Sequence, residues 1–286
     1  MMISRINIGI WHWHRPAMMG LLLISFNFFS CQEKIEWELS MSNDVRLVVE
    51  GKITNEQRAH LVRLSVPVYE INGRPEPVSG ANVVISDGDT IFQLTEDPEQ
   101  PGSYYTDPDV RGVVNRTYRL GIELGDYQFG GIASMKGVTP IRTPAFQKVQ
   151  DDPPLYEMRF FGNDEPSRLK FELDWSHLPG YDTLPATENH AILYAYYFSA
   201  LTVDVNEIFS SPGDRVFFPP GTVIAVAKES LSSGYAQYLR GILSETSWNG
   251  GLFDVKPGDP ANNLSPGAIG YFAACSVIRD TATFRP

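Results

Sequence analysis

Cysteine and histidine are scarce in this sequence of 286 residues, which has two cysteines and five histidines. Structural zinc sites need several clustered cysteine or histidine ligands, and the sequence has no such cluster. It also lacks the Gly-x-Ser-x-Gly elbow of hydrolases, a phosphate-binding Gly-Lys-Ser/Thr loop, Cys-x-x-Cys and His-Glu-x-x-His. Sequence motifs therefore predict no catalytic residue, no metal site and no cofactor.

Basic residues and long hydrophobic runs are in short supply as well. The chain has 23 Lys and Arg against 34 Asp and Glu, a formal net charge of −11, so nucleic acid is not an expected partner. The apolar run at residues 17–29 has 13 residues, whereas a membrane-spanning helix needs roughly 20. Arg5 and Arg15 precede this run, and Ser30-Cys31 follows it. This order of basic, apolar and small residues predicts a secretory signal peptide over residues 1–30.

The predicted signal peptide ends at a cysteine. Phe28, Phe29 and Ser30 precede Cys31 and resemble the bacterial lipobox, although Phe28 stands where leucine is usual. The lipobox thiol receives a diacylglyceryl group, and several acyl chains give stable membrane anchoring. We therefore expect a lipid anchor at Cys31. The alternative is an ordinary secretory peptide in which Cys31 has no role.

An acidic segment follows the predicted anchor. Without residues 1–30 the chain loses two arginines and no acid, so its formal net charge becomes −13. Residues 31–44 are predicted to be a lipidated tether, and the acid-rich stretch 32–38 resembles the surface-export signal of Bacteroidetes lipoproteins. This resemblance favours an outer-membrane protein on the cell surface rather than on the periplasmic face. The alternative is a solvated tether with no export role.

The residues after the tether favour β structure, because Val, Ile, Tyr, Phe, Gly and Pro are frequent there. Alternating segments separated by turns predict a Greek-key, immunoglobulin-like β-sandwich over residues 45–142. The expected strands cover residues 45–53, 61–66, 83–86, 91–95, 102–106, 117–124 and 127–134. Asp87-Gly88-Asp89 predicts a hairpin turn rather than a calcium site, which would need more oxygen ligands. Tyr118 follows a polar corner, where sandwiches place a tyrosine whose hydroxyl bonds the backbone.

Prolines cluster around residues 140–154 and place the predicted domain boundary near residue 142. Residues 143–286 are predicted to be a second β-rich domain, with strands at 169–175, 191–198, 222–227 and 269–277. A helix near 233–246 should begin at Ser232 or Ser233 and cover one face of this second sheet. Cys275 lies in the apolar last strand and is interpreted as a core residue, not as a nucleophile.

The turn-rich segment before the last strand is the candidate recognition loop. It contains Asp259, Asn262 and Asn263, and binding residues are often carried on loops over a rigid sheet. The alternative is that this segment only wraps the edge of a sheet.

Three Asp-Thr-apolar triplets resemble the O-glycosylation sequon of Bacteroidetes. Their central residues are Thr90, Thr183 and Thr281. Glycosylated threonines have to be exposed and to lie at turns or sheet edges. These three threonines are therefore candidate modification sites.

Five short stretches, in fixed order, carry a family resemblance. They are Leu47-Val-Val-Glu-Gly51, Pro77-Val-Ser-Gly-Ala-Asn-Val83, Gly102-Ser-Tyr-Tyr105, Thr117-Tyr-Arg-Leu120 and Gly267-Ala-Ile-Gly-Tyr-Phe272. From about residue 47 to residue 277 the chain resembles the Bacteroidetes lipoprotein family of the domain of unknown function DUF4249. The resemblance implies an outer-membrane lipoprotein with an immunoglobulin-like or carboxypeptidase-regulatory-like N-terminal sandwich, often accompanying a TonB-dependent transporter. It implies no catalytic residues.

The expected function is a non-enzymatic binding or accessory subunit associated with a TonB-dependent transporter. The alternative is a secreted hydrolase that acts on glycans at the domain junction, since 34 acidic residues offer many carboxylate pairs. The adjacent pairs Asp151 with Asp152 and Asp164 with Glu165 are interpreted as solvated loop residues. A binding subunit should expose an apolar or aromatic patch, whereas a hydrolase should show converging carboxylates or a histidine-activated nucleophile.

Overall fold

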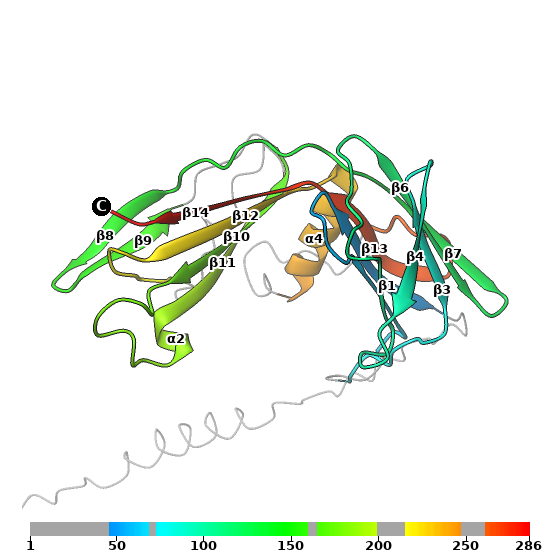
Figure 1. Ribbon diagram of the computed structural model, residues 1–286, viewed down its shortest axis with the longest axis horizontal. Coiled ribbons are helices and arrows are strands. Elements are labelled where there is room, and N and C mark those ends of the chain that lie inside the picture. Colours follow the sequence, from blue (N-terminus) through cyan, green and yellow to red (C-terminus); the bar gives the residue numbers. More distant parts are fainter. Residues whose placement is uncertain (1–45, 69–72, 160–164, 199–214, 247–260) are drawn as a thin grey trace, which may run out of the picture. The chain divides into compact units, whose positions relative to one another are not determined.

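The computed structural model describes residues 46–286 apart from the segments 69–72, 160–164, 199–214 and 247–260. The predicted signal peptide and Cys31 lie outside the described residues. The described chain forms mainly β-strands, with α4 (Ser233–Thr246) as its long helix and α2 (Ala186–Asn189) as a single turn (Figure 1). This confirms the predicted mainly β fold. In the described part, neither helix has the length and apolar character needed to cross a bilayer.

A large sheet of eight strands has the order β13-β1-β2-β5-β4-β3-β6-β7. Its strands are β1 (Leu47–Thr54), β2 (Leu61–Ser65), β3 (Asn82–Ser86), β4 (Ile91–Glu96), β5 (Ser103–Tyr105), β6 (Thr117–Leu124), β7 (Tyr127–Ser134) and β13 (Ala268–Cys275). Neighbouring strands pair antiparallel, except that β1 and β13 run parallel. The strands expected from alternation before residue 135 therefore all belong to one sheet.

Alternation along each strand builds the core of the large sheet. In β6, Tyr118, Leu120 and Ile122 are buried, whereas Arg119 on the opposite face is exposed. Successive side chains of a strand point to opposite faces, and each large apolar side chain that is buried contributes about 1.5–3 kcal/mol. The Tyr118 hydroxyl accepts a hydrogen bond from the backbone N–H of Val113 at 2.6 Å. The predicted bond between this tyrosine and the backbone is confirmed.

The two outer strands of the large sheet, β7 and β13, are joined through Asn263. Its amide donates to the carbonyl oxygens of Ile132 in β7, at 2.9 Å, and of Phe272 in β13, at 2.7 Å. Its side-chain oxygen accepts from the N–H of Phe272 at 3.0 Å. The side chain thus acts as a strand residue between the two edges and satisfies their backbone polar groups.

The position of β13 corrects the sequence analysis, which assigned residues 269–277 to the second domain. The strand pairs instead with β1, from Leu47 opposite Ala268 to Thr54 opposite Cys275. Parallel strands need a long connection, and here more than half of the chain separates the partners, so no local pattern reveals the pairing. The large sheet is therefore completed by residues from beyond the predicted boundary near residue 142.

A small antiparallel sheet has the order β11-β10-β12-β14. Its strands are β10 (Ser167–Asp174), β11 (His190–Tyr197), β12 (Val223–Ser230) and β14 (Val277–Thr283). A hairpin of β8 (Ala145–Asp151) and β9 (Pro154–Arg159) contributes to the core of this sheet. The ring of Phe284 lies 4.4 Å from that of Phe146 and 5.0 Å from that of Tyr156, centroid to centroid. These aromatic contacts join the hairpin to the end of the chain.

Helix α4 has the bounds expected from its sequence, and its first turn is capped by Ser232. The Ser232 hydroxyl accepts from the N–H of Tyr235 at 3.2 Å. Tyr235 and Tyr238 both pack on Tyr271 of β13, with ring centroids 5.1 Å apart in each pair. The helix was expected to cover the second sheet, but its aromatic contacts are with the large sheet. Because β13 was assigned to the wrong sheet, the partner of α4 was mispredicted too.

Candidate functional site

The junction between the two sheets is the place where the hydrolase alternative puts its site. The chain passes from β13 to β14 through one residue, Ser276, which is buried. The buried hydroxyl of Ser230 accepts from the N–H of Ser276 at 2.9 Å and donates to the carbonyl of Lys136 at 2.8 Å. The Ser230 N–H donates to the carbonyl of Ser276 at 2.9 Å. These bonds tie three chain segments together and use the serine hydroxyls for structure.

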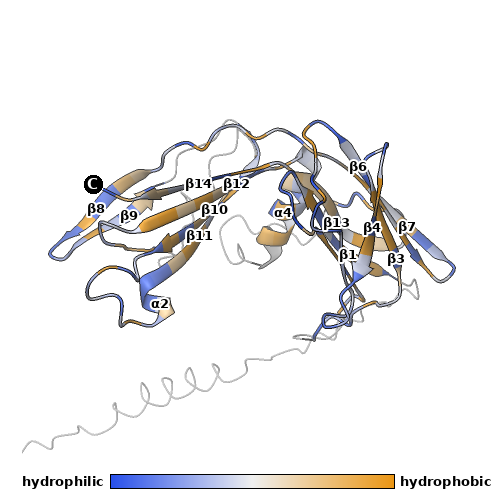
Figure 2. Ribbon diagram, viewed as in Figure 1, coloured by the Kyte–Doolittle hydropathy of each residue, from blue (hydrophilic) through white to orange (hydrophobic). Residues whose placement is uncertain are grey.

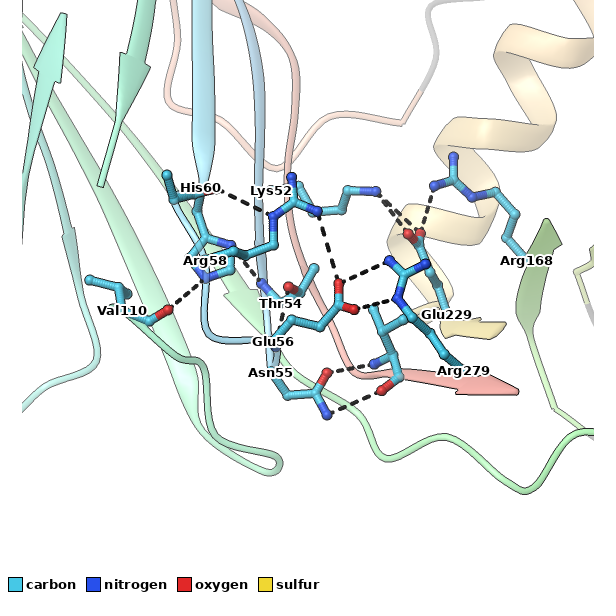
Figure 3. Close-up of polar contacts among 12 residues, drawn as sticks. Lys52, Thr54, Asn55, Glu56, Arg58, His60, Val110, Arg168, Glu229 and Arg279 are labelled. Carbon is cyan, nitrogen blue, oxygen red and sulfur yellow. Dashed lines mark hydrogen bonds and ion pairs between the residues drawn. The ribbon is translucent and has the colours of Figure 1, made fainter. Parts of the chain in front are cut away.

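The carboxylate of Glu229, the residue before Ser230, is paired with two cations. Glu229 of β12 accepts from Lys52 of β1, whose Nζ is 3.2 Å from each carboxylate oxygen, and from Arg168 of β10 at 2.7 Å (Figure 3). Burial by itself raises the pKa of Glu229, but the charges and hydrogen bonds of Lys52 and Arg168 outweigh it and hold that pKa below its ordinary value. Glu229 is therefore ionised and paired, whereas a general acid needs a raised pKa.

Two further contacts join the end of β1 to the start of β14. The Asn55 side chain accepts from the N–H of Val277 at 2.6 Å and donates to its carbonyl at 3.3 Å. Arg279 donates to both carboxylate oxygens of Glu56, at 2.6 and 3.3 Å (Figure 3). Another part of the same chain thus engages each of the polar side chains Lys52, Asn55, Glu56, Arg168, Glu229 and Arg279.

Neither Cys275 nor His60 has the surroundings of a nucleophile or a base. The Cys275 thiol is fully buried, and burial, together with the nearby charge of Glu229, raises its pKa to about 12. This confirms its interpretation as a core residue. His60 is buried, its Nδ1 accepts from the N–H of Thr54 at 3.4 Å, and its Nε2 contacts the carbonyl of Val110 at 3.2 Å. Burial is the main cause that lowers the pKa of His60, so the ring is neutral and structural.

A serine, an aspartate and a histidine do lie together on the small sheet. Asp174 accepts from the hydroxyl of Ser176 at 2.7 Å and lies 3.1 Å from Nε2 of His190. A catalytic triad places the histidine between the hydroxyl and the carboxylate. Here the aspartate is in the middle, so the arrangement orients no nucleophile.

The carboxylates interpreted as loop residues have partners. Asp151 pairs with Lys148 at 2.6 Å and is almost fully exposed, as interpreted, but it is the last residue of β8, whereas Asp152 is exposed in the turn that follows. Glu165 lies in a loop, as interpreted, but it is only partly exposed, and its carboxylate is 3.6 Å from Nζ of Lys228, whose side chain is buried. Asp164 lies outside the described residues.

The carboxylate of Glu157, which is buried, is also neutralised by cations. It accepts from Nε of Arg215 at 2.9 Å and forms an ion pair with Arg159. In the part of the chain that the structure describes, no three His, Cys, Asp or Glu side chains group closely enough to hold a metal ion. The carboxylates of Glu229 and Glu157 are thus both engaged in ion pairs.

The predicted recognition loop is described only in part, because Asp259 lies outside the described residues. Asn262 donates to the carbonyl of Ala268 at 2.9 Å and accepts from the N–H of Leu264 at 2.8 Å. Asn263 joins β7 to β13 as described above. Both amides thus serve the backbone at a sheet edge, which is the alternative that the sequence left open.

The three candidate glycosylation sites meet the geometric requirement. Thr90 and Thr183 are exposed in turns, and Thr281 is exposed on β14, an edge strand of the small sheet. In the first turn, Asp87 accepts from the N–H groups of Asp89 and Thr90 at 3.1 and 2.8 Å, as expected for a hairpin turn. Modification of the three threonines stays a prediction.

An exposed row of apolar and aromatic side chains runs along β11. Ile192 is 56% exposed and Tyr194 is 47% exposed. The rings of Tyr194 and Tyr196 are stacked with centroids 6.3 Å apart, and those of Tyr196 and Phe198 with centroids 5.9 Å apart. Figure 2 shows hydrophilic residues where α2 meets β11 and hydrophobic residues directly after them. No motif marks this row, but the unbroken apolar run at residues 191–198 could have indicated it.

The fold and these contacts define a mainly β protein whose described polar clusters hold segments of the chain together, and which exposes a row of aromatic side chains along β11. The family model described as Domain of unknown function (DUF4249) matches residues 32–281, so the chain belongs to this family. The family resemblance of the sequence is thereby confirmed. No curated protein matches the chain.

Proposed function

We propose that this protein is a non-enzymatic binding lipoprotein of the outer membrane and an accessory subunit of a TonB-dependent transporter. The observation that carries the proposal is the exposed row on β11, where Ile192 and Tyr194 are about half exposed on an edge strand. Large exposed apolar side chains in a row are typical of interaction surfaces. Aromatic residues are also enriched in such surfaces.

The paired charges support binding rather than catalysis. Glu229, Glu157 and Glu165 are each engaged by cations, Cys275 is buried with a raised pKa, and the buried His60 has both ring nitrogens in contact with backbone groups. A hydrolase needs a group with a pKa tuned for proton transfer within reach of substrate. The described clusters offer structural ion pairs in its place.

The membrane part of the proposal rests on the sequence before the described residues. The apolar run that ends at Ser30-Cys31 favours a lipid anchor at Cys31. The acidic residues that follow favour the cell surface. Substitution of Cys31 by serine should release the protein from the membrane fraction, because the lipid would be attached to the Cys31 thiol.

The test is affinity purification of the tagged protein from detergent-solubilised outer membranes of its native host, followed by mass spectrometry. Cells that produce the untagged protein are the control. Stoichiometric recovery of a TonB-dependent transporter is the expected result. Recovery of the lipoprotein alone would overturn the proposed accessory role and would direct the work to glycan binding and hydrolase assays.

A further inference from the structure

The loop of residues 175–189 joins β10 to β11 and ends with α2, which directly precedes β11 (Figure 1). It is held by one buried side chain, Asn189, whose amide nitrogen donates to the carbonyl oxygens of Tyr181 and Leu184, at 3.0 Å each. Both hydrogens of that nitrogen are thereby used, and a flipped amide would lose both bonds. The amide oxygen of Asn189 is therefore the atom that faces the ring of His190.

His190, the first residue of β11, has an oxygen atom beside each of its ring nitrogens. Its Nδ1 is 2.5 Å from the amide oxygen of Asn189, and its Nε2 is 3.1 Å from Oδ1 of Asp174 on β10. An amide oxygen and a carboxylate oxygen only accept hydrogen bonds. A neutral imidazole has one N–H and one lone pair, so it would place the lone pair against one of these oxygens. Only the imidazolium, with an N–H on each nitrogen, suits both neighbours.

Asp174 keeps its negative charge over the pH range in which histidines titrate. The hydroxyl and the N–H of Ser176 donate to its Oδ1 at 2.7 and 2.9 Å. These two bonds, the hydroxyl first, are the main causes that hold the pKa of Asp174 below its ordinary value. The charge that faces Nε2 of His190 is therefore constant, and between about pH 5 and 8 only the ring changes its charge.

The elements around this pair carry other titratable groups. They are Lys170 and Glu172 of β10, His177, Tyr181 and Asp182 of the loop, and Glu188 of α2. Lys170 and Glu172 pair with each other, and β12 places the uncharged Val223 opposite Asp174. Of the groups in this list, only His177 has an ordinary pKa near neutral pH. Its Nε2 contacts the carbonyl oxygen of Gly221 at 3.1 Å, so it belongs to a separate contact.

We propose that His190 is a proton-operated latch: its imidazolium joins Asp174 to Asn189 and holds the loop of residues 175–189 in place, and release of one proton to water loosens this loop. The neutral ring keeps the proton on Nδ1, which bonds Asn189, and loses the proton on Nε2. The lone pair on Nε2 then faces the Asp174 carboxylate and is repelled by it. The loop is therefore held more firmly at pH 5.5 than at pH 8. This inference goes beyond the proposed function and does not depend on it.

The protonation of His190 can be followed directly by NMR of its ring nitrogens. The detergent-solubilised full-length protein, labelled with ¹⁵N-histidine, is titrated from pH 5 to pH 9, and the His190 signals are assigned by their absence in His190→Gln. At pH 5 both nitrogens should have the shifts of an imidazolium, and the neutral ring should carry its proton on Nδ1. A neutral ring protonated on Nε2 would overturn the latch, because Nδ1 could then not donate to Asn189.

Amide hydrogen exchange measures how firmly the loop is held. The N–H of Leu184 donates to the carbonyl oxygen of Tyr181 at 3.2 Å, and the N–H of Tyr181 to that of Leu178 at 3.0 Å, so both amides report on the loop. After correction for the intrinsic exchange rate, their protection should fall at least about three-fold between pH 5.5 and pH 8. Amides of β6 in the large sheet are the control and should keep their protection. Loop protection that does not change with pH would refute the latch.

Matched variants assign the pH response to its group. His190→Gln removes the titrating ring and Asp174→Asn removes the charge that it faces, so each should abolish the pH dependence of loop protection. His177→Gln removes the other histidine of the loop and should leave that dependence unchanged. If His190→Gln alters the circular dichroism spectrum, Asp174→Asn still decides, because asparagine keeps an oxygen that accepts from Ser176. A pH response that persists in Asp174→Asn, or that disappears in His177→Gln, would contradict the assignment to His190.

Discussion

The substitution Glu229→Gln should destabilise the fold strongly. Its carboxylate is 15% exposed and faces the Lys52 ammonium and the Arg168 guanidinium, which are 32% and 23% exposed. Removing one partner of a buried ion pair costs about 3–5 kcal/mol, because a charge stays buried without compensation. Partial exposure of the two cations reduces this cost, so we expect a loss of about 2–3 kcal/mol in the free energy of unfolding.

The same sheet offers a matched control. Lys170 and Glu172 form an ion pair whose side chains are 35% and 54% exposed. Exposed pairs contribute about 0–1 kcal/mol, so Glu172→Gln should change stability little. Urea unfolding of both variants, followed by tryptophan fluorescence, measures the difference. Equal stability of the two variants would refute the structural role assigned to Glu229.

The effect of Glu229→Gln should depend on pH in a defined direction. The folded-state pKa of Glu229 is lowered from its ordinary value of 4.5, because the stabilisation by Lys52 and Arg168 exceeds the cost of burial. A carboxyl whose pKa is depressed on folding stabilises the protein above its unfolded pKa, and this is lost as pH falls through the folded pKa. The difference in unfolding free energy between wild type and Glu229→Gln should therefore be largest at pH 7 and should decrease below about pH 4.5. A gap that widens on acidification would contradict this assignment.

Three further outcomes are expected. Asn263→Ala removes three hydrogen bonds to backbone groups of β7 and β13, so it should lower the free energy of unfolding in urea by about 1–3 kcal/mol. Asn82→Ala is the control and should lower it less, because the Asn82 amide bonds only side chains. Cys275 should resist iodoacetamide at pH 8 until the protein is unfolded, because its pKa is raised to about 12. The intact mass of the native protein should exceed that of the lipidated chain by the mass of glycans; no excess would exclude modification at Thr90, Thr183 and Thr281.

Local patterns in the sequence predicted the elements whose structure depends on neighbours in the chain. The β3–β4 hairpin forms at Asp87, where the carboxylate bonds backbone groups two and three residues on. Helix α4 begins after Ser232, whose hydroxyl caps the first turn. Tyr118 bonds the backbone five residues before it. Each feature is decided within a few residues, so residue types in order are sufficient to predict it.

Sequence reasoning failed where partners lie far apart in the chain. The burial of Phe272 and Cys275 in β13 was predictable from an apolar run, but the run does not show which strand lies beside it. The parallel pairing with β1 was therefore missed, and with it the packing of α4. The bond between Asn263 of the candidate recognition loop and Ile132, more than a hundred residues earlier, was not predictable for the same reason.

The sequence by itself determined the family, the mainly β composition of the chain, its excess of acids and the burial of Cys275. Apolar periodicity reports whether a residue faces a core, because that preference acts on each side chain separately. The tertiary structure alone decided that Glu229 lies between Lys52 and Arg168, and that β11 and β14 are the edges of the small sheet. Strand order and ion pairing depend on which distant backbones and charges satisfy one another at the same time, and that is fixed only when the whole chain has folded.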